Sequence, residues 1–414
     1  ATTEIYTLSL HDALPDLGGG FTGLACAKEL SSRRFDVTLV DQKPHFEFLP
    51  NIHELLSAVK QPHQLRLDLK VAMRALGHSF TQGQLTAINP KRRSVTLAEH
   101  PQLSADYLVV TLGGVDTDFG VPGVREHAYG FKSVDQCARI GQRFEHLKKS
   151  GKDFHIAVIG AGLEGIEAAG ELLRNRDEGD GRGNITVIEA RSTLLPERGG
   201  AVSKHLLRLF KDESVTVHLG DPVSKITAKT VTLASGTRIR SDLTIWTGGA
   251  IPNPLLTESG LAAKNHWVPV ESTLLHPDFA EVFVGGDSAA PPQPVSKQAY
   301  NALDMGNLIG KNIERRQGRL PAFAYRPASK PQLISIGDLD TILLTERFAL
   351  ASPSLAPGKE LIFNAVMTQL DQRSAPLRIG SVLARNRQAA NELLWPALRK
   401  RDLLKRARQV RLLR

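Results

Sequence analysis

The sequence predicts an α/β protein with two related parallel-sheet units, the second inserted into the first, and a smaller α+β region near the C-terminus. The first observation is that the pattern G-x-G-x-x-G occurs twice, at residues 18–23 and 160–165. Each copy opens a stretch with helical character, which is followed by an apolar run that ends in an acid. The second observation is that an apolar strand closing on glycine recurs at 107–113, 243–249 and 282–286. This internal repetition indicates that one unit interrupts the other.

The composition sets the broad class of the protein. A chain of 414 residues suggests two or three domains. Its 41% hydrophobic content, 35 glycines and 23 prolines are typical of a soluble α/β protein, and it lacks any run of about 18 uncharged apolar residues. The two cysteines, Cys26 and Cys137, cannot form a disulfide framework, which favours a cytoplasmic location and a buried structural role for Cys26. We predict no metal site.

The two glycine motifs have the spacing of dinucleotide-binding turns. Their glycines are Gly18, Gly20 and Gly23 in the first copy and Gly160, Gly162 and Gly165 in the second. Such glycines let the backbone turn tightly and approach a pyrophosphate, whose charge lies on the helix N-terminus. The acids that end the next strands, Asp41 and Glu189, would accept hydrogen bonds from a ribose diol. Two such copies predict two dinucleotides, which usually are a flavin and a nicotinamide that exchange a hydride.

The residues before the first motif do not have the pattern of a central strand. The segment 10–17 places charges on both sides of Pro15, which cannot donate to a strand ladder. The segment resembles the translation of a common sequencing adapter, so we expect residues 1–15 not to be native and the first unit to lack its native strand. Resequencing of the genomic locus tests this expectation, and recovery of the same codons would contradict it.

The remaining boundaries and elements follow from changes in composition. A polar stretch at 150–153 precedes the second motif and predicts a boundary there. Hairpins are expected at 85–97 and 332–345, and a helix at 296–315. We therefore expect four segments: the first unit over 16–150 and 268–325, the inserted unit over 151–267, and a C-terminal region over 326–414.

These motifs resemble the family of flavoproteins that bind two dinucleotides and share the pyridine nucleotide-disulfide oxidoreductase fold. The resemblance covers roughly residues 16–345 and implies two Rossmann-like, three-layer ββα domains, the NAD domain inserted into the FAD domain. It implies that Asp41 binds the adenosine ribose of FAD and that Gly286 and Asp287 contact its ribityl and phosphate region. Glu189 would bind the ribose diol of NADH, and because an acid repels a 2′-phosphate, NADH is favoured over NADPH. Arg191 nearby weakens that preference.

The branch of the family follows from further motifs. Disulfide reductases need a C-x-x-x-x-C pair, and the corresponding region 44–59 has no cysteine. Cys26 and Cys137 are poorly placed for a sulfide:quinone reductase. The best match is the type II NADH dehydrogenase-like branch, where the second motif continues as G-x-E-x-x-G-E, here residues 165–171. The other cofactor-binding residues that the resemblance implies are Pro50 under the flavin loop and the strand-ending glycines Gly113, Gly248 and Gly249.

Two departures bear on the acceptor and on the flavin site. The A-T-G sequence of the branch is Thr111-Leu112-Gly113 here, and its quinone-pocket pattern A-Q-x-A-x-Q-Q is only partly present at 296–302.

By resemblance, Glu167 points toward the nicotinamide–flavin contact and orients the amide or relays a proton, unless it only pairs with a neighbouring base. Lys297 or Gln298 would stabilise negative charge on the reduced flavin, unless they serve in capping or face solvent.

The loop histidines and the C-terminal tail complete the expectations. His45 and His53 flank the flavin loop and are expected to be surface residues. Residues 399–414 contain eight Lys or Arg against one acid, whereas the formal net charge of the chain is +9. With apolar residues at helical spacing, residues 397–414 predict a basic amphipathic helix on the anionic inner face of the cytoplasmic membrane. The alternatives are a helix packed on its own domain or a tail without structure.

The sequence therefore predicts an enzyme that takes a hydride from NADH onto FAD and passes electrons to a quinone or another small acceptor. A reductase of a ferredoxin- or rubredoxin-type protein is the alternative of the same class, since a basic tail would also dock an acidic partner. A flavin redox sensor or a nucleic-acid-binding module is the alternative of another class. Because the chain outside the tail is close to neutral, we expect no nucleic-acid partner. A second copy of this chain, in a homodimer, is another possible partner.

Overall fold

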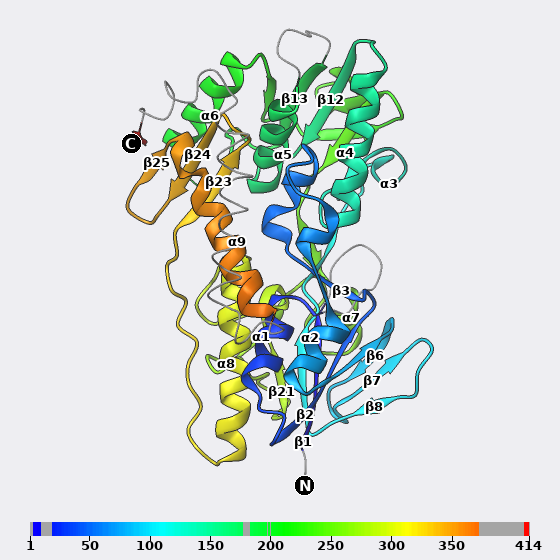
Figure 1. The fold of residues 1–414 in the computed structure, drawn as a ribbon. Coiled ribbons are helices and arrows are strands. Elements are labelled where there is room, and N and C mark those ends of the chain that lie inside the picture. Colours follow the sequence, from blue (N-terminus) through cyan, green and yellow to red (C-terminus); the bar gives the residue numbers. More distant parts are fainter. Residues whose placement is uncertain are drawn as a thin grey trace.

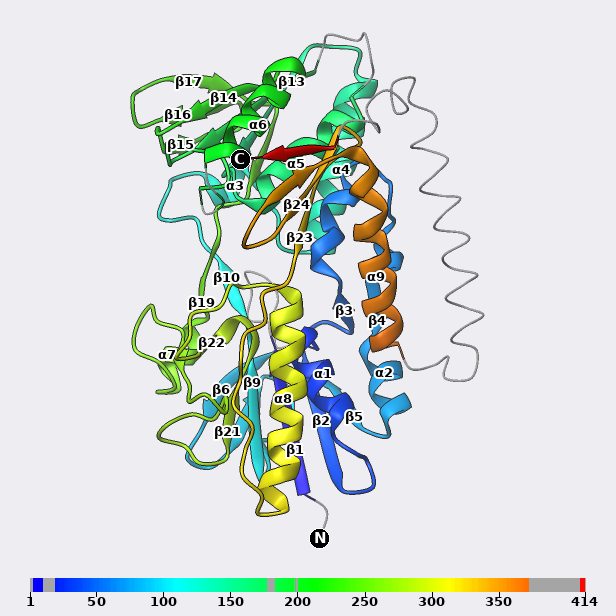
Figure 2. The same ribbon diagram turned by 90° about the vertical axis from the view of Figure 1, so that its left-hand side faces the viewer.

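The structure, a computed structural model, describes residues 3–9, 19–176, 183–196, 198, 200–371 and 410–413. Two parallel five-stranded sheets lie at opposite ends of an elongated molecule, and a smaller antiparallel sheet with helix α9 lies beside the second one (Figures 1 and 2). The predicted α/β class, with two sheet units and a C-terminal α+β region, is therefore confirmed.

The first sheet has the strand order β21-β9-β1-β2-β5, and all of its pairs are parallel. Its strands are β1 (Thr3–Ser9), β2 (Phe35–Asp41), β5 (Ser79–Gln82), β9 (Tyr107–Thr111) and β21 (Val282–Val284). Strand β9 is buried at every residue, as expected of a parallel strand covered on both faces. Helices α1 (Phe21–Glu29), α2 (Leu69–Leu76) and α8 (Ala299–Gln317) belong to this unit, as does the meander β6 (Leu85–Asn89), β7 (Ser94–Leu97) and β8 (Leu103–Ser104).

The central strand of this sheet comes from the segment that was expected not to provide one. Strand β1 lies between β2 and β9, with Ile5 opposite both Val37 and Tyr107. Its residue types, which include Ile5 and Tyr6, favour a strand, whereas the proline-containing stretch 10–17 does not. Residues 10–18 lie outside the described residues, and the non-native origin of residues 1–15 stays a prediction.

The second sheet has the order β11-β18-β12-β13-β14 and is also parallel throughout. Its strands are β11 (Tyr129–Gly130), β12 (Phe154–Ile159), β13 (Gly183–Glu189), β14 (Thr216–Leu219) and β18 (Leu243–Trp246). Helices α4 (Val134–Lys149), α5 (Leu163–Arg174) and α6 (Gly200–Asp212) accompany it. A second meander consists of β15 (Val223–Ile226), β16 (Thr230–Leu233) and β17 (Arg238–Arg240).

The chain crosses between the two units at a two-stranded antiparallel ribbon. Strand β10 (Gly114–Asp116) pairs with β19 (Ala250–Pro252), and both lie between the sheets in Figure 2. Because β11 already belongs to the second sheet, the expected boundary at 150 lies too late in the chain. The expected boundary at 267 also lies too late, because the chain already leaves the second unit through β19. The insertion of one unit into the other is nevertheless as expected.

Short elements connect these units. They are β3 (His45–Glu47), β4 (Arg66–Asp68), α3 (Val124–His127), α7 (Pro254–Glu258), β20 (Val268–Pro269), β22 (Ala289–Ala290), and the 3-10 helices η1 (Leu49–Leu55), η2 (Pro62–Leu65), η3 (Gly286–Ser288) and η4 (Pro353–Leu355).

Cys26 is buried on α1, where burial raises the pKa of its thiol, and both cysteines are free.

The C-terminal region contains an antiparallel sheet and one long helix. The strands of the sheet are β23 (Gln332–Ile336), β24 (Asp340–Leu344), β25 (Ala349–Ala351) and β26 (Arg411–Leu413), and helix α9 (Ala356–Leu370) lies between β25 and β26 in the sequence. Both predicted hairpins are present. The predicted tail helix is wrong for residues 411–413, because they pair with β25 as a strand. Residues 397–409 and 414 of the predicted helix lie outside the described residues. In the described part of the chain, no helix is both long and apolar enough to cross a membrane.

Helices α1 and α8 approach each other through two glycines of α8. A Cβ atom at Gly306 would lie 2.3 Å from the carbonyl oxygen of Thr22, and one at Gly310 would lie 2.6 Å from Cβ of Glu29. Both distances are shorter than a van der Waals contact, so a side chain there would push α8 away. The close packing fixes the first glycine turn, which directly precedes α1, against α8.

This packing predicts that Gly306→Ala destabilises the protein by about 1–3 kcal/mol, the usual range for overpacking in a core. Gly318→Ala is the matched control, because the atom nearest to its Cβ would be 3.5 Å away and its φ of −77° suits alanine. Thermal unfolding followed by circular dichroism measures both changes. Equal melting temperatures for the two variants would contradict the proposed helix contact.

Candidate functional site

The described part of the first glycine motif, from Gly19 onward, leads directly into helix α1. Gly20 is the N-cap of α1 with φ −70° and ψ −175°, and no side chain caps the helix. Its carbonyl accepts the amide of Leu24 at 3.1 Å, so the helix begins directly after the turn. Gly23 is buried within α1. Gly18 lies outside the described residues, so its predicted role stays a prediction.

The second glycine motif has an N-cap residue with nearly the same backbone angles as Gly20. Gly162 is the N-cap of α5 with φ −70° and ψ −171°, and Gly160 has a φ of +95° that favours glycine. A Cβ at Gly165 would lie 1.9 Å from the carbonyl oxygen of Gly160, which explains the third glycine. A Cβ at Gly162 would meet no atom within 4 Å, so open space lies in front of a bare helix N-terminus. This arrangement fits an anionic group.

The two acids that follow the glycine turns are held in similar ways. Oδ1 of Asp41 accepts the amide of Lys43 at 2.7 Å, and Oε1 of Glu189 accepts the amide of Arg191 at 2.9 Å. Oε2 of Glu189 also accepts the amide of Ala161 at 2.7 Å, which places this carboxylate beside the second glycine turn. Both acids are at least nine-tenths buried, so their positions at the strand ends are fixed.

The strand-ending glycines take conformations that few other residues adopt. Gly113 and Gly286 both have a φ of +63°, and a Cβ at Gly286 would lie 2.5 Å from Oγ1 of Thr22. Gly249 has a φ of +94°, and a Cβ at Gly248 would lie 2.5 Å from Nε1 of Trp246. The glycines at these positions therefore allow close approach of backbone and side chains at the ends of β9, β18 and β21.

A pocket of about 350 Å³ brings most of the predicted residues of the first unit together with one from the second. The predicted residues in its wall are Gly20, Pro50, Gly113, Glu167, Gly286, Asp287, Lys297 and Gln298. Apolar residues from β23 and α9, among them Leu333, Ile334 and Ile362, form another part of the wall. The glycines and the acid of the second motif, with Gly248 and Gly249, do not line this pocket.

Lys297 lies at the rim of the pocket, where its side chain binds the backbone of the loop after β21. Its ammonium donates to the carbonyl oxygens of Asp287 at 2.5 Å and Ala289 at 3.0 Å, and it lies 4.2 Å from the ring centroid of Trp267. Although the residue is exposed at the rim, desolvation of the ammonium lowers the pKa of Lys297 to about 8. Burial raises the pKa of the Asp287 carboxyl, against the opposing charges of Lys297 and Lys132.

Gln298 occupies the N-cap position of α8, but its side chain makes no capping hydrogen bond. Its Oε1 is buried and has no hydrogen-bond partner among the described residues. The capping alternative for Gln298 is therefore wrong, and its amide is available to a ligand.

Glu167 lies on α5 in a buried cluster of charges at the pocket wall. It contacts Nζ of Lys359 from α9 in an ion pair, and Oε1 accepts the amide of Ser335 at 3.2 Å. Its Oε2 is 3.5 Å from Nδ1 of His53, whose Nε2 is 3.2 Å from Nζ of Lys359. Burial raises the pKa of Glu167, and Lys359 opposes that rise. Glu167 therefore both lines the pocket and pairs with a base.

The expectation for His53 is wrong. Its side chain is only 1% exposed, and burial, with the charges of Lys359, Arg174 and Lys60, lowers its pKa well below the ordinary value. His53 is therefore a neutral buried group that contacts both members of the Glu167–Lys359 pair. The other loop histidine, His45, is half-buried on β3.

A second layer of charge lies one helical turn beyond Glu167. Glu171 is fully buried, accepts a hydrogen bond from the hydroxyl of Ser57 and lies 3.2 Å from Nη2 of Arg174. Arg174 also pairs with Asp338 at 2.8 Å. Burial raises the pKa of Glu171 to about 7. These contacts join α5 to the segment after η1 and to the turn after β23.

Three further charged side chains in or beside the pocket were not predicted from the sequence: Lys359, Lys132 and Glu164. Lys359 lies on α9, where no motif marks it. Lys132, between β11 and α4, forms an ion pair with Glu164 in the first turn of α5. Glu164 itself lines the pocket. The position of Glu164 within the second motif gave no signal for a lysine partner, because the helix dipole itself favours a negative charge in the first turn.

Comparisons with known proteins agree with this geometry. Among curated proteins, the demethylphylloquinone reductase NdbB of Synechocystis sp. is 25% identical over 372 residues, covering 84% of this chain and 90% of that protein. The type II NADH:quinone oxidoreductase of Staphylococcus aureus is 22% identical over 373 residues, covering 84% of this chain and 92% of that protein.

Solved structures show the same fold at lower identity. NDH2 of Plasmodium falciparum in complex with NADH has a TM-score of 0.76 at 16% identity, covering 89% of this chain and 95% of that chain. A ferredoxin reductase from Rhodopseudomonas palustris has a TM-score of 0.71 at 18% identity, covering 84% of this chain and 88% of that chain.

The family itself follows from a direct match. Residues 17–306, more than half of the chain, match the family model of the pyridine nucleotide-disulphide oxidoreductases. The match contains both glycine motifs, both acids, and strand β21 with the glycines that follow it. This chain therefore belongs to the pyridine nucleotide-disulphide oxidoreductase family.

Proposed function

We propose that this protein is an FAD-dependent NADH:quinone oxidoreductase. The observation that carries the proposal is the single pocket in which residues of the first dinucleotide unit, Glu167 of the second unit and the apolar wall of the C-terminal region meet. Electron transfer between two cofactors and an acceptor needs such a junction. The names of the curated relatives, a demethylphylloquinone reductase and an NADH:quinone oxidoreductase, support the same activity.

The residues of the first unit fit FAD. The bare N-terminus of α1 after Gly20 would hold the pyrophosphate, and Asp41 would hold the adenosine ribose. The pocket beyond them has aromatic and apolar walls, including Phe48 and Leu49, that suit a flat ring system. When bound, FAD would supply the capacity to accept a hydride and to pass electrons on.

The second unit fits NADH better than NADPH. Both oxygens of the Glu189 carboxylate accept backbone amides at a strand end, so its negative charge lies where the adenosine ribose would bind. A 2′-phosphate there would be repelled. The helix N-terminus at Gly162 would hold the pyrophosphate.

The chain's own groups at the pocket serve charge and orientation. The Glu167 carboxylate, held by Lys359 and the amide of Ser335, would orient the carboxamide of the nicotinamide or exchange a proton at its oxygens. The Lys297 ammonium places a positive charge at the rim, where it would stabilise negative charge that develops in the pocket. The apolar side chains of β23 and α9 that line the pocket would help to exclude water once the cofactors are bound.

The apolar wall favours a quinone over a protein acceptor. Leu333, Ile334 and Val366 line the inside of the pocket, where an aromatic ring would be covered by side chains. A ferredoxin would dock on the outer surface and would not need this wall. The ferredoxin reductase among the structural neighbours shares the fold alone. We also propose peripheral association with an anionic membrane surface, which would bring the enzyme to a lipid-soluble acceptor.

An acceptor assay tests this function. FAD-loaded protein should oxidise NADH rapidly with a soluble quinone, and much more slowly with ferredoxin as the sole acceptor. NADPH should be a poorer donor than NADH by at least tenfold in kcat/KM. Activity only with ferredoxin would instead identify a ferredoxin reductase. Negligible turnover with both acceptors, together with salt-sensitive DNA binding, would identify the sensor or nucleic-acid module.

Replacement of Glu167 tests its role at the pocket. Glu167→Gln should lower kcat about 10²-fold, because the carboxylate's charge and basicity are lost while its shape stays. It also leaves Lys359 unpaired, so the double variant with Lys359→Met should recover stability without recovering activity. Steady-state kinetics and thermal unfolding separate the two effects. Glu171→Gln, one turn along α5 and outside the pocket wall, is the control and should retain turnover; an equal loss of kcat in both variants would contradict a local role for Glu167.

The lowered pKa of Lys297 predicts a pH dependence. A lysine is charged below its pKa, so a rate that needs this charge should fall as pH rises through about 8. Lys297→Arg keeps the charge and should move the alkaline limb of kcat/KM upward, since arginine stays protonated. Lys297→Met should lower the rate about 10²-fold and lack the limb. An unchanged limb in Lys297→Met would assign it to another group.

A further inference from the structure

In the described part of the chain, the ammonium of Lys297 is held by neutral groups alone. It donates to two backbone carbonyls, those of Asp287 and Ala289, and lies 4.2 Å from the ring centroid of Trp267. None of the carboxylates that the structure describes forms an ion pair with it. By contrast, Lys132 and Lys359, the other lysines at the pocket, are each paired with a glutamate.

The pairing of β20 with β22 places Trp267 beside one of the carbonyls that Lys297 binds. Trp267 directly precedes β20, and the next residue, Val268, is opposite Ala289 of β22. The indole also lies against β10, where a Cβ at Gly114 would be 2.9 Å from Cη2 of the ring. Glycine thus leaves room for the indole. Two separate elements fix the aromatic face on which the ammonium lies.

An aromatic face holds a cation without neutralising it. The ring quadrupole attracts the ammonium, but an indole has no net charge to set against that of lysine. A carboxylate in the same place would bind the ammonium and cancel its field. Lys297 therefore keeps a fixed position and an effective positive charge, and it lines the first pocket.

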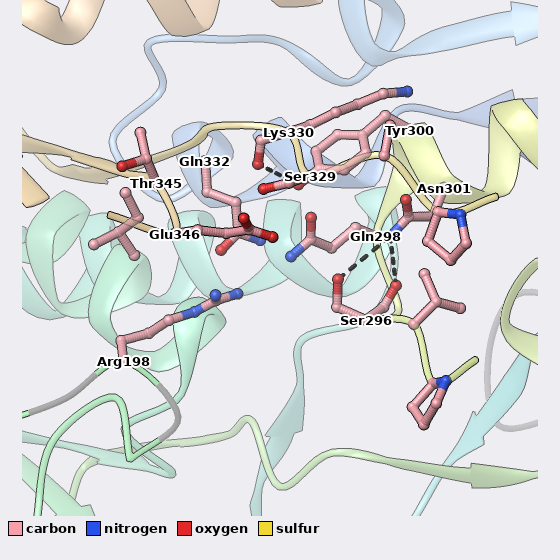
Figure 3. A pocket seen from close by; sticks show the side chains of 15 residues that line it. Arg198, Ser296, Gln298, Tyr300, Asn301, Ser329, Lys330, Gln332, Thr345 and Glu346 are labelled. Carbon is pink, nitrogen blue, oxygen red and sulfur yellow. Dashed lines mark hydrogen bonds between the residues drawn. The ribbon is translucent and has the colours of Figure 1, made fainter. Parts of the chain in front are cut away.

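Without such contacts, the lysine side chain would have another direction to take. Ser296 and Gln298, its neighbours in the chain, line a second pocket of about 250 Å³ that adjoins the first (Figure 3). Ser296 and Ser329 of that pocket are exposed, so solvent reaches this side of the chain. A lysine has a long, flexible stem and a strongly hydrated head. The contact with Trp267 therefore opposes a turn of the ammonium away from the first pocket.

We propose that Trp267 is a positioning residue, which holds the Lys297 ammonium at the first pocket with its charge not neutralised. This rests on the proposed function, in which that charge stabilises negative charge that develops in the pocket. Trp267 belongs to none of the predicted motifs and does not itself line the first pocket. It acts through Lys297 and not by contact with the reacting groups.

The groups around Lys297 set the sign of the expected pH dependence. Desolvation lowers the pKa of Lys297, and the negative charge of Asp287 opposes this. Lys132 and Glu164 in turn act on Asp287. An aromatic face favours the charged form of a lysine, so removal of Trp267 should lower the pKa of Lys297 further. The alkaline limb of kcat/KM should then move to lower pH by about 0.5 pH unit.

Two measurements on the full-length protein test the proposal. In pH profiles of the FAD-loaded enzyme, Trp267→Leu should move the limb and lower kcat/KM about threefold above it. Trp267→Phe, which keeps an aromatic face, should lie between Trp267→Leu and the wild type. In a Lys297→Arg background the same changes should move no limb. The NMR resonance of the ε-carbon of Lys297, identified by its loss in Lys297→Arg, reports the titration directly and without turnover.

Phe323→Leu is the matched control, because Phe323 also has a cation over its ring, that of Arg315 at 4.1 Å, at the opposite end of α8. It should leave both the limb and the lysine resonance unchanged. If Trp267→Leu lowers the melting temperature too far, Trp267→Phe still decides the test.

An unchanged titration of Lys297 in both Trp267 variants would overturn the proposal and leave the proposed function intact. An equal shift in Phe323→Leu would also overturn it, because the effect would then not be local. A wild-type protein that does not oxidise NADH, but in which Trp267→Leu still shifts the lysine resonance, would contradict the proposed function and support the contact.

Discussion

The ion pair between Glu167 and Lys359 is the contact on which the arrangement of the pocket depends. It joins α5, which follows the second glycine turn, to α9 of the C-terminal region, and His53 from η1 contacts both partners. All three side chains are buried, and a buried charge without its partner is costly, so the two helices hold each other in place. Three parts of the chain that are remote in sequence thereby form one wall.

Other charged groups lie around the rim of the pocket. Lys132 compensates Glu164 at the start of α5, and Lys297 holds the loop that contains Asp287. At the edge, Lys132 is thus paired with a carboxylate and Lys297 with two backbone carbonyls, while the side chains that β23 and α9 add to the wall are mostly apolar. A pocket of this kind can exclude water and still present one carboxylate and one ammonium to bound cofactors.

Much of the fold follows from local signals in the sequence. Glycine spacing and the acids at the strand ends predict both turns, because each feature depends on a few neighbouring residues, as Gly160 and Glu189 illustrate. The boundary at 150 was misplaced because β11 consists of only two residues and carries no strand pattern. The central position of β1 was missed since the proline-containing stretch that follows it masked a short strand at residues 3–9.

The site is less predictable, because its charges meet across long distances in the sequence. Glu167 has a motif, but Lys359 and His53 have none, and their contacts exist only once the units are assembled. Gln298 was recognised by position, whereas its free buried oxygen is visible only in three dimensions. Residues that pair locally can be read from spacing; residues that pair between units cannot.

The most direct test is a rapid-mixing experiment on the flavin absorbance of the FAD-loaded protein under anaerobic conditions. NADH should bleach the oxidised flavin band within the time of one turnover, and a subsequent mix with quinone should restore it at a rate that matches kcat. A flavin that NADH does not bleach, or that quinone does not reoxidise, would contradict the central claim that this pocket couples NADH to a quinone.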